Sequence, residues 1–254
     1  ELPRSCACQV TGWQLRPAGA GWQADLDELQ ALITPQTRLI MVNSPHNPTG
    51  HLFTPEEWQR LIDLAAGQDI ILFADEVYKY LEYEQSPLPW ACDLYENAVS
   101  LGVMSKSFGL PGLRIGWIAT GNRGIFQAMA AYKDYTTICN SAPSEFLATL
   151  ALRHRTRILE RNRNLVKDNL HLLDSFFARH PEKFEWLCPQ AGPIAFPAFR
   201  NPVSASHYAE ELAASCGILL LPGSCYDYDD RHFRIGFGRA NFPEVLQRWE
   251  EHLG

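Results

Sequence analysis

The sequence predicts an α/β protein, in which a mostly parallel sheet with flanking helices is followed by a smaller C-terminal α+β domain. In the first part of the chain, short and wholly apolar runs alternate with amphipathic segments of helical period. Such alternation is typical of parallel sheets whose crossover connections are helices. The predicted order of helices and strands changes near residue 155, so we expect two domains, residues 1–155 and residues 156–254.

Composition and charge narrow the possible partners. The chain has 254 residues, 46% of them hydrophobic and 20% charged, which is ordinary for a globular protein with a sizeable core. Its net charge of -7 argues against nucleic acid or an anionic membrane as the main partner. No apolar run is long enough to span a bilayer. Because the chain starts at Glu1 without methionine, we expect it to be part of a longer polypeptide.

The cysteines and the N-terminal pattern bear on location and on metals. Seven cysteines are scattered without a framework, which is typical of reduced thiols. The first residues lack the basic and apolar regions of a signal peptide. We therefore expect a cytoplasmic protein. Cys6 and Cys8 have no matching second pair, which argues against a zinc site.

In the first part, strands are predicted at residues 8–15, 39–42, 70–74, 98–104 and 115–119. The run 39–42 has no polar alternation, which predicts a strand covered on both faces. A helix is predicted to begin at Asp25, in an acidic start that resembles a capping box. A second begins at Thr54 with a proline and then a glutamate at the positions of a capping box, and Gly67 closes it.

The second part is predicted to be richer in helices. Helical patterns cover residues 125–133, 144–154 and 156–179, and the charged face of the last is expected to be solvated. Strands are predicted at 184–187, 193–199, 218–221 and 233–237, with a helix from Ser204 to Gly217 between them. Asn241 is expected to cap a final amphipathic helix.

The stretch from Ser100 to Trp117 contains the sharpest chemical signal. Lys106 lies between two apolar runs, where a lysine is costly unless its charge is neutralised or used. Gly109, Pro111 and Gly112 impose a loop after it, and Arg114 follows at the start of the next run. Arginine binds phosphate through two parallel hydrogen bonds. A lysine near a guanidinium that binds phosphate suggests an amine that forms a Schiff base with a phosphorylated aldehyde. The ordinary alternative is a solvated lysine and a surface arginine.

Polar residues follow three of the predicted strands. Asn47 lies in a turn after the run 39–42, Asp75 ends the run 70–74, and Lys106 follows the run 98–104. Since ligands in such sheets collect beyond the carboxyl ends of the strands, we expect these three residues to converge on one site. Taken singly, Asn47 is also compatible with an ordinary turn and Asp75 with a helix cap.

The string Ser-Lys-Ser-Phe-Gly-Leu-Pro-Gly-Leu-Arg-Ile-Gly-Trp, residues 105–117, resembles the cofactor-lysine segment of fold-type I pyridoxal-phosphate enzymes, the class I/II aminotransferases. The resemblance covers essentially the whole chain. It implies the cofactor pyridoxal 5'-phosphate, bound as a Schiff base to Lys106. It also implies that residues 1–155 are an incomplete cofactor-binding domain.

The same resemblance assigns roles to further residues. Asp75 matches the carboxylate that pairs with the pyridine nitrogen, and with Lys106 and Tyr78 it completes the catalytic set. Asn47 and Tyr78 match the residues that hold the cofactor's phenolic oxygen. Arg234 matches the arginine that binds the substrate's α-carboxylate, and Asn47 is expected to line the same substrate site. Without the resemblance, Tyr78 would be interpreted as core and Arg234 as an exposed edge-strand residue.

The phosphate site departs from the family pattern. Arg114 matches the arginine that binds the phosphate. Many relatives have a serine three positions before the lysine, where this chain has Val103. Ser105 is found in the histidinol-phosphate-aminotransferase-like branch and is expected to serve instead. The family's glycine-rich phosphate cup and its ring-stacking aromatic residue lie upstream of the region where this chain begins.

The resemblance implies an aminotransferase that moves an α-amino group between an amino acid and a 2-oxo acid, usually as a homodimer with the site at the subunit interface. Two alternatives stay open. One is another pyridoxal-phosphate reaction on an amino acid, such as β-elimination, decarboxylation or cyclisation. The other is a non-catalytic module that senses the cofactor in a regulator. The sequence does not identify the amino acid.

Overall fold

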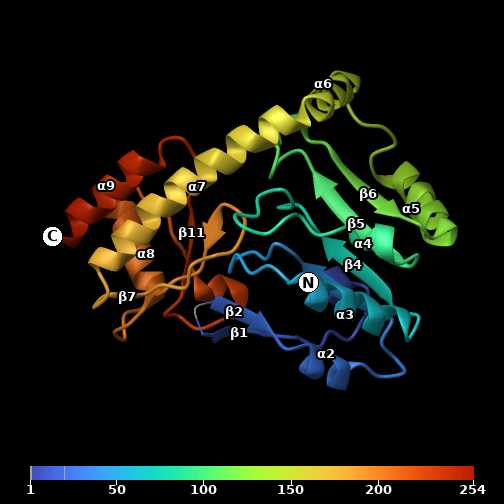
Figure 1. Ribbon diagram of the computed structural model, residues 1–254, viewed down its shortest axis with the longest axis horizontal. Coiled ribbons are helices and arrows are strands. Elements are labelled where there is room, and N and C mark those ends of the chain that lie inside the picture. Colours follow the sequence, from blue (N-terminus) through green and yellow to red (C-terminus); the bar gives the residue numbers. More distant parts are fainter. Residues whose placement is uncertain (1, 20) are drawn as a thin grey trace.

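A four-stranded sheet lies at the centre of the first part of the chain in the computed structural model, which describes residues 2–19 and 21–254 (Figure 1). Its strand order is β3 (Leu39–Asn43), β4 (Ile71–Asp75), β5 (Ala98–Val103) and β6 (Gly116–Thr120). The strands β3, β4 and β5 are parallel, whereas β6 runs antiparallel to β5. The predicted α/β fold with a mostly parallel sheet is confirmed.

The segment before this sheet differs from the prediction. No strand crosses residues 8–14; instead β1 (Leu15–Ala18) and β2 (Gly21–Ala24) form an antiparallel hairpin. Most of the segment 8–14 is exposed, and its one half-buried side chain, Trp13, donates from the indole nitrogen to the Asp25 carbonyl at 2.8 Å. A stretch that buries so little apolar surface gains nothing from joining a sheet.

The predicted helix starts of the first part are confirmed. The Asp25 carboxylate caps α2 (Leu26–Leu32) by accepting from the backbone of Asp27 and Glu28. Thr54 and Glu57 form a complete capping box at the start of α3 (Pro55–Ala66). The apolar face of α3 is buried with the inner faces of β3 and β4 in one core cluster. Two short helices, α1 (Leu2–Ser5) and α4 (Ala91–Leu94), were not predicted.

Parts of this sheet and its helices are not covered by the described chain. Met41 of β3 is 56% exposed and Leu39 is also exposed, so the expectation of a strand covered on both faces is not met here. In α5 (Arg123–Thr136) no residue is buried, and Tyr135 is 90% exposed. These elements therefore carry more apolar side chains than the described chain buries.

The second part is a smaller α+β unit around a separate aromatic core. Its sheet has the order β10 (Leu221–Pro222), β11 (Phe233–Gly236) and β8 (Ile194–Ala195), and β7 (Phe184–Glu185) pairs with β9 (Ala198–Phe199). The predicted strand 193–199 is interrupted at Pro197, whose ring removes a backbone donor. The helices α8 (Ala205–Cys216) and α9 (Phe242–Leu253) pack on this core.

One long helix connects the two parts. Figure 1 shows α7 (Arg155–Arg179) running from α6 (Ala142–Arg153) to a position beside α9. Residues from the second half of α7 enter the C-terminal core cluster, whereas α3 and β4 belong to the other. The division at residue 155 into two domains stays a prediction. None of the helices in the described part of the chain is long and apolar enough to cross a membrane.

Gly102 tests the contact between β5 and β6. A Cβ atom at this position would lie 2.4 Å from Cε2 of Trp117, which faces Gly102 in the antiparallel register. We expect Gly102→Ala to lower the free energy of unfolding by about 1–3 kcal/mol, because the indole must move. Urea unfolding of the intact protein measures the change. Gly21→Ala, in the open space of β2, is the control, and equal effects of the two substitutions would contradict the prediction.

Candidate active site

The loop after β3 is anchored to β4 by one side chain. Asn43, the last residue of β3, donates from Nδ2 to the Asp75 carbonyl at 2.9 Å and accepts at Oδ1 from the backbone nitrogen of Asn47 at 2.7 Å. This double contact holds Asn47 near the carboxyl end of β4. The Nδ2 group of Asn47 makes no hydrogen bond to a described residue and can donate to a ligand.

Asp75 ends β4 with a carboxylate that the protein only partly satisfies. Its Oδ1 accepts from the backbone nitrogen of Val77 at 3.2 Å. Burial raises the pKa of Asp75, while the Val77 N–H and the charge of Lys106 oppose the rise. No cation in the described residues forms an ion pair with it. A carboxylate in this state gains from a cationic partner.

Tyr78 packs between Asp75 and the C-terminal part of the chain. Its side chain is 6% exposed, and its ring belongs to a small cluster with Leu81 and Ile194. Burial raises the pKa of Tyr78, whereas the charge of Arg234 lowers it. The hydroxyl makes no hydrogen bond to a described residue, and it is not among the atoms that are sealed from solvent. It is therefore free to donate to a ligand.

Lys106 lies in the loop between β5 and β6 and is exposed, not enclosed between the strands. Its Nζ is 5.5 Å from the centre of the Tyr78 ring. The loop is fixed from two sides: the hydroxyl of Ser107 donates to the Val77 carbonyl at 3.0 Å, and Nδ2 of Asn162 in α7 donates to the Ser107 carbonyl at 2.9 Å. The backbone of Lys106 is thus held in place while its amine is left without an ion pair in the described structure.

Ser105 and Arg114 lie at the two ends of this loop. The β5–β6 ladder ends at the pair Val103 and Gly116, and Met104 donates to the Ile115 carbonyl just beyond it, so Ser105 follows β5 and Arg114 precedes β6 closely in sequence. Arg114 is exposed, precedes β6 and caps the short 3₁₀ helix η1 (Pro111–Leu113) in a left-handed conformation. Its guanidinium donates within the loop to the Pro111 carbonyl at 3.2 Å.

Arg234 joins the two parts of the chain at the site. It lies on β11 and donates from Nη1 to Oδ1 of Asn47 at 3.3 Å. The guanidinium is partly buried, yet it forms no ion pair with a carboxylate of the described residues. A desolvated guanidinium without an anion is a ready site for an external carboxylate.

These contacts bring five of the seven predicted residues into one group. Lys106 lies over Tyr78, and the charges of Asp75 and Arg234 both act on the Tyr78 hydroxyl. Arg234 in turn contacts Asn47. Ser105 and Arg114 lie at the base of the Lys106 loop, but no hydrogen bond in the described part joins Arg114 to the other five. The roles predicted for all seven residues stay predictions.

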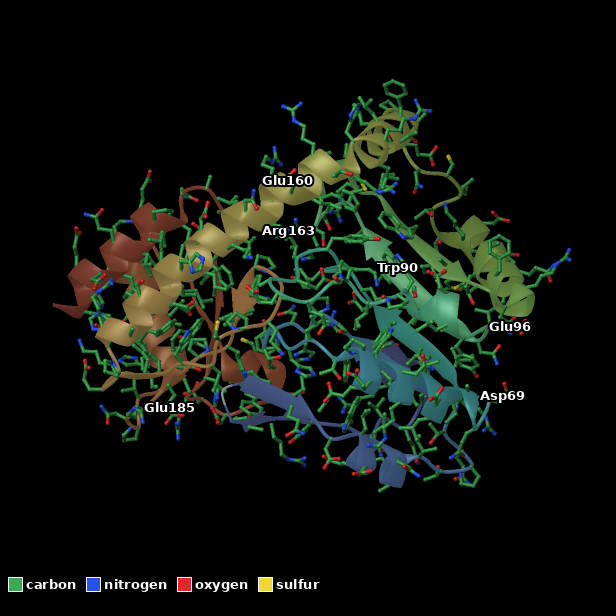
Figure 2. The ribbon with its side chains drawn as sticks, in the orientation of Figure 1. Asp69, Trp90, Glu96, Glu160, Arg163 and Glu185 are labelled. Atoms are coloured by element: carbon green, nitrogen blue, oxygen red, sulfur yellow. The ribbon has the colours of Figure 1, made fainter. Side chains whose placement is uncertain are left out.

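A buried ion pair supports the site and was missed in the sequence. Lys79 donates to Glu76 at 2.9 Å, with both side chains almost fully buried, and its Nζ lies 4.6 Å from the ring centre of Trp90. Trp90, which is labelled in Figure 2, immediately precedes the short helix α4. Glu76 also accepts from the Ala91 backbone. The pair fixes the turn that presents Asp75 and Tyr78. Its spacing of three residues could have suggested an ion pair, but nothing local indicates that it is buried.

A segment of the C-terminal part inserts beside these loops. The backbone nitrogens of Gln190 and Ala191 both donate to the Gly50 carbonyl, at 2.9 and 3.2 Å, and that of Gly192 donates to the Leu81 carbonyl at 2.9 Å. A Cβ atom at Gly50 would lie 2.3 Å from Cβ of Pro189, so the approach requires a glycine there. The segment 189–192 therefore binds both the Asn47 loop and the chain after Tyr78.

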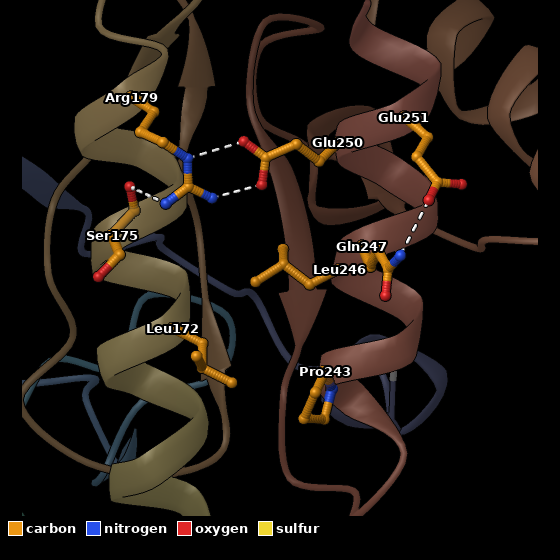
Figure 3. Close-up of a pocket in the computed structure, with 8 residues that line it drawn as sticks. All are labelled: Leu172, Ser175, Arg179, Pro243, Leu246, Gln247, Glu250 and Glu251. Carbon is orange, nitrogen blue, oxygen red and sulfur yellow. Dashed lines mark hydrogen bonds and ion pairs between the residues drawn. The ribbon is translucent and has the colours of Figure 1, made fainter.

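One groove lies away from the predicted site residues. A groove of about 260 Å³ separates α7 from α9 (Figure 3). Arg179 crosses it to Glu250 at 2.7 Å, and none of the predicted site residues lines it. This groove is a structural seam between two helices.

Comparison with known proteins finds related sequences and similar structures. The sequence profile of the family "Aminotransferase class I and II" matches residues 3–248. Capreomycidine synthase of Streptomyces vinaceus is 30% identical over 255 residues, covering 100% of this chain and 65% of that protein. The crystal structure of a PLP-dependent aminotransferase from Streptococcus suis 89-1591 has a TM-score of 0.91 and 29% identity, covering 99% of this chain and 66% of that chain. For the PLP-dependent cyclase OrfR the values are 0.88 and 31%, covering 99% and 67%.

The buried carboxylate of Glu82 gives a test of the electrostatics beside the site. Burial raises the pKa of Glu82 above 4.5, opposed first by the backbone N–H groups of Glu82 and Tyr80 and then by the charges of Lys79 and Arg163. A carboxyl group whose pKa is raised on folding binds more protons in the folded state than in the unfolded state. The folded protein therefore loses stability as the pH rises above about 4.5.

We therefore expect Glu82→Gln to raise the free energy of unfolding at pH 8 and to leave it unchanged near pH 4. Urea unfolding of the intact protein at both pH values measures this difference. Glu84→Gln is the control, because the Glu84 side chain is 93% exposed. An equal gain at both pH values for Glu82→Gln would show that the charge is not the cause.

Proposed function

We propose that this chain, which belongs to the family of class I and II aminotransferases, carries the catalytic centre of an enzyme that moves an α-amino group between an amino acid and a 2-oxo acid. The observation that carries the proposal is the grouping of Lys106, Tyr78 and Arg234. Within the described residues, the Lys106 amine and the Arg234 guanidinium form no ion pair, and both act on Tyr78, whose hydroxyl has no hydrogen-bond partner there. The chain spans about two thirds of the length of the relatives it matches, so the activity is proposed for the intact protein.

Pyridoxal 5'-phosphate is the cofactor of the family, and the residues present fit it. The cofactor has an aldehyde, a pyridine nitrogen, a phenolic oxygen and a phosphate. The described structure offers a group for each: an unpaired amine at Lys106, a buried carboxylate at Asp75, free donors at Asn47 and Tyr78, and a guanidinium at Arg114.

When bound, the cofactor supplies a carbonyl that condenses with amines and a protonated ring that accepts an electron pair from the substrate's α-carbon. In the proposed mechanism the Asp75 carboxylate keeps the proton on the pyridine nitrogen, because its burial makes an unpaired negative charge costly. With its amine free, Lys106 would be the base that takes the proton from the substrate's α-carbon.

The remaining residues bind and orient. Asn47 and Tyr78 would donate to the phenolic oxygen, while Ser105 and Arg114, at the two ends of the Lys106 loop, would hold the phosphate. Arg234 binds the substrate's α-carboxylate and so fixes the direction of the α-proton toward the lysine. Asn47 contacts Arg234 at 3.3 Å and thereby joins the cofactor end of the site to the substrate end.

Cyclisation of an amino acid is a second candidate, because two relatives suggest it. Capreomycidine synthase and the cyclase OrfR are as similar to this chain as the aminotransferase from Streptococcus suis. Both reactions begin with removal of the α-proton, so the same lysine, aspartate and arginine would serve them. The pocket around the substrate side chain would decide between them.

We also propose that the intact protein is a cytoplasmic homodimer. An apolar surface over α5 and α6 supports the assembly, since its exposed side chains include Phe126, Tyr132, Tyr135, Ile138 and Phe146. We assign a second copy as its partner, and a monomeric mass in sedimentation of the intact protein would exclude this. Seven unpaired cysteines support a reducing compartment.

The function is tested by the products. The intact protein, loaded with pyridoxal 5'-phosphate, is incubated with each amino acid and 2-oxoglutarate, and the mixture is analysed by mass spectrometry. We expect glutamate and the matching 2-oxo acid. A product that has lost no nitrogen and forms without 2-oxoglutarate would instead establish cyclisation, and pyruvate with ammonia would establish elimination.

Lys106→Ala is the matched control and should abolish turnover. A second measurement does not depend on activity: borohydride reduction of the loaded protein should attach the cofactor to the peptide that contains Lys106. Attachment to another lysine would refute the role of Lys106.

Arg234 and Arg114 are expected to bind different anions. Arg234→Ala should raise the KM for amino acid and 2-oxo acid strongly, on the order of a 2–5 kcal/mol loss in binding, because it removes one partner of a buried ion pair. Its affinity for pyridoxal 5'-phosphate should stay near that of the wild type. Arg114→Ala should show the opposite pattern in the same two titrations. If Arg234→Ala loses the cofactor and keeps its KM, the two assignments are reversed.

A further inference from the structure

The long helix α7 crosses between the two parts of the chain, and its first half packs against the loop that carries Lys106 (Figure 1). Ile158 of α7 packs on a hydrophobic cluster that includes Met104 and Phe108. These two residues lie two positions before and two positions after Lys106, and both are buried. Because the lysine is anchored on each side in this way, the position of the helix determines the position of the loop.

One amide of α7 adds a directed contact to this packing. Nδ2 of Asn162 donates to the Ser107 carbonyl at 2.9 Å. Its Oδ1 accepts from Nε and Nη2 of Arg161, at 3.1 and 2.9 Å, which orients the amide with its donor toward the loop. The Gly109 nitrogen donates to the Lys106 carbonyl at 2.8 Å, and a Cβ atom at Gly109 would lie 3.1 Å from Nδ2 of Asn162. The amide therefore lies directly against the turn that contains the lysine.

The second half of α7 holds the strand that carries Arg234. Phe233, the residue before Arg234 on β11, lies in one core cluster with residues from this half of the helix. The buried Asn169 donates from Nδ2 to the carbonyls of Phe237 and Arg239, at 2.7 and 2.9 Å, just beyond the end of β11. The helix thus contacts the strand of the arginine both by packing and by hydrogen bonds.

The spacing of the two amides makes α7 a spacer between these contacts. Asn162 and Asn169 are seven residues apart, and residues at this spacing lie on one face of a helix. The rise of an α-helix places them about 10 Å apart along its axis. The sequence of α7 contains no proline or glycine, the usual causes of a sharp kink. The distance between the lysine loop and the end of β11 is therefore set by a rigid element.

We propose that Asn162 is a positioning residue: through its amide, α7 sets the place of Lys106 relative to the carboxylate that Arg234 binds. The inference rests on the proposed function, in which Lys106 takes the α-proton of a substrate that Arg234 orients. Proton removal is sensitive to this separation, since misplacing a reacting group by about 1 Å costs on the order of 100-fold in rate. Loss of the amide should therefore slow proton removal more than it weakens substrate binding.

Asn162→Ala tests the proposal in the intact, cofactor-loaded protein, because it removes the hydrogen bonds of the amide and leaves the packing of Ile158. We expect kcat per loaded site to fall about 10- to 100-fold, with the KM for amino acid and 2-oxo acid within about threefold of the wild type. The kinetic isotope effect of a substrate deuterated at the α-carbon should be at least that of the wild type, because proton removal is the step that slows. An isotope effect below the wild-type value would overturn the inference.

Asn164→Ala is the matched control, because Asn164 is exposed on the same helix. Hydrogen–deuterium exchange of the intact protein without substrate is independent of activity: the backbone amides of Gly109 and Leu110, which close the lysine loop, should exchange faster in Asn162→Ala and not in the control. A wild-type kcat in Asn162→Ala overturns the inference alone. A wild-type protein that exchanges no substrate α-proton with deuterated water overturns the proposed function, and the inference with it.

Discussion

The parallel register of β3, β4 and β5 is the constraint on which the whole site depends. The register pairs Asn43 with Asp75 and Asp75 with Leu101, so β3 and β4 end at the same level and β5 runs on to Val103 at the same edge. Because of this alignment a single amide, that of Asn43, reaches both the end of β4 and the loop that carries Asn47. The loops that bear Asn47, Tyr78 and Lys106 all leave from this edge. Antiparallel strands would send alternate loops to opposite edges.

Two kinds of charge lie side by side in this structure. Glu76 and Lys79 are buried but satisfy each other, and Glu76 takes a further hydrogen bond from the Ala91 backbone. Their neighbour Asp75 is partly buried, and neither it nor Arg234 forms an ion pair with a residue that the structure describes. The satisfied pair stabilises the turn, whereas the unsatisfied groups are available for ligands. The structural carboxylate of Glu76 thus directly follows the carboxylate of Asp75, which we propose to pair with the cofactor.

Local sequence patterns predicted the positions of helices and strands better than they predicted which of their faces are buried. The strands 70–74, 98–104 and 115–119 and the cap at Thr54 are confirmed, because apolar runs and capping residues act over a few positions. The predicted strand 8–15 was wrong, and β3 is exposed on one face, since burial depends on distant partners.

Contacts within the site likewise depend on residues that are distant in the sequence. The resemblance selected residues such as Asn47 and Arg234, yet their contact joins positions 187 residues apart. The segment 189–192 ties the C-terminal sheet to Gly50 and Leu81. A rigid-body rotation of that sheet would either break the four backbone hydrogen bonds between this segment and Gly50, Leu81 and Tyr83, or strain the Asn43 contacts that hold the Asn47 loop to β4. The tie therefore opposes movement of Arg234 relative to Asn47.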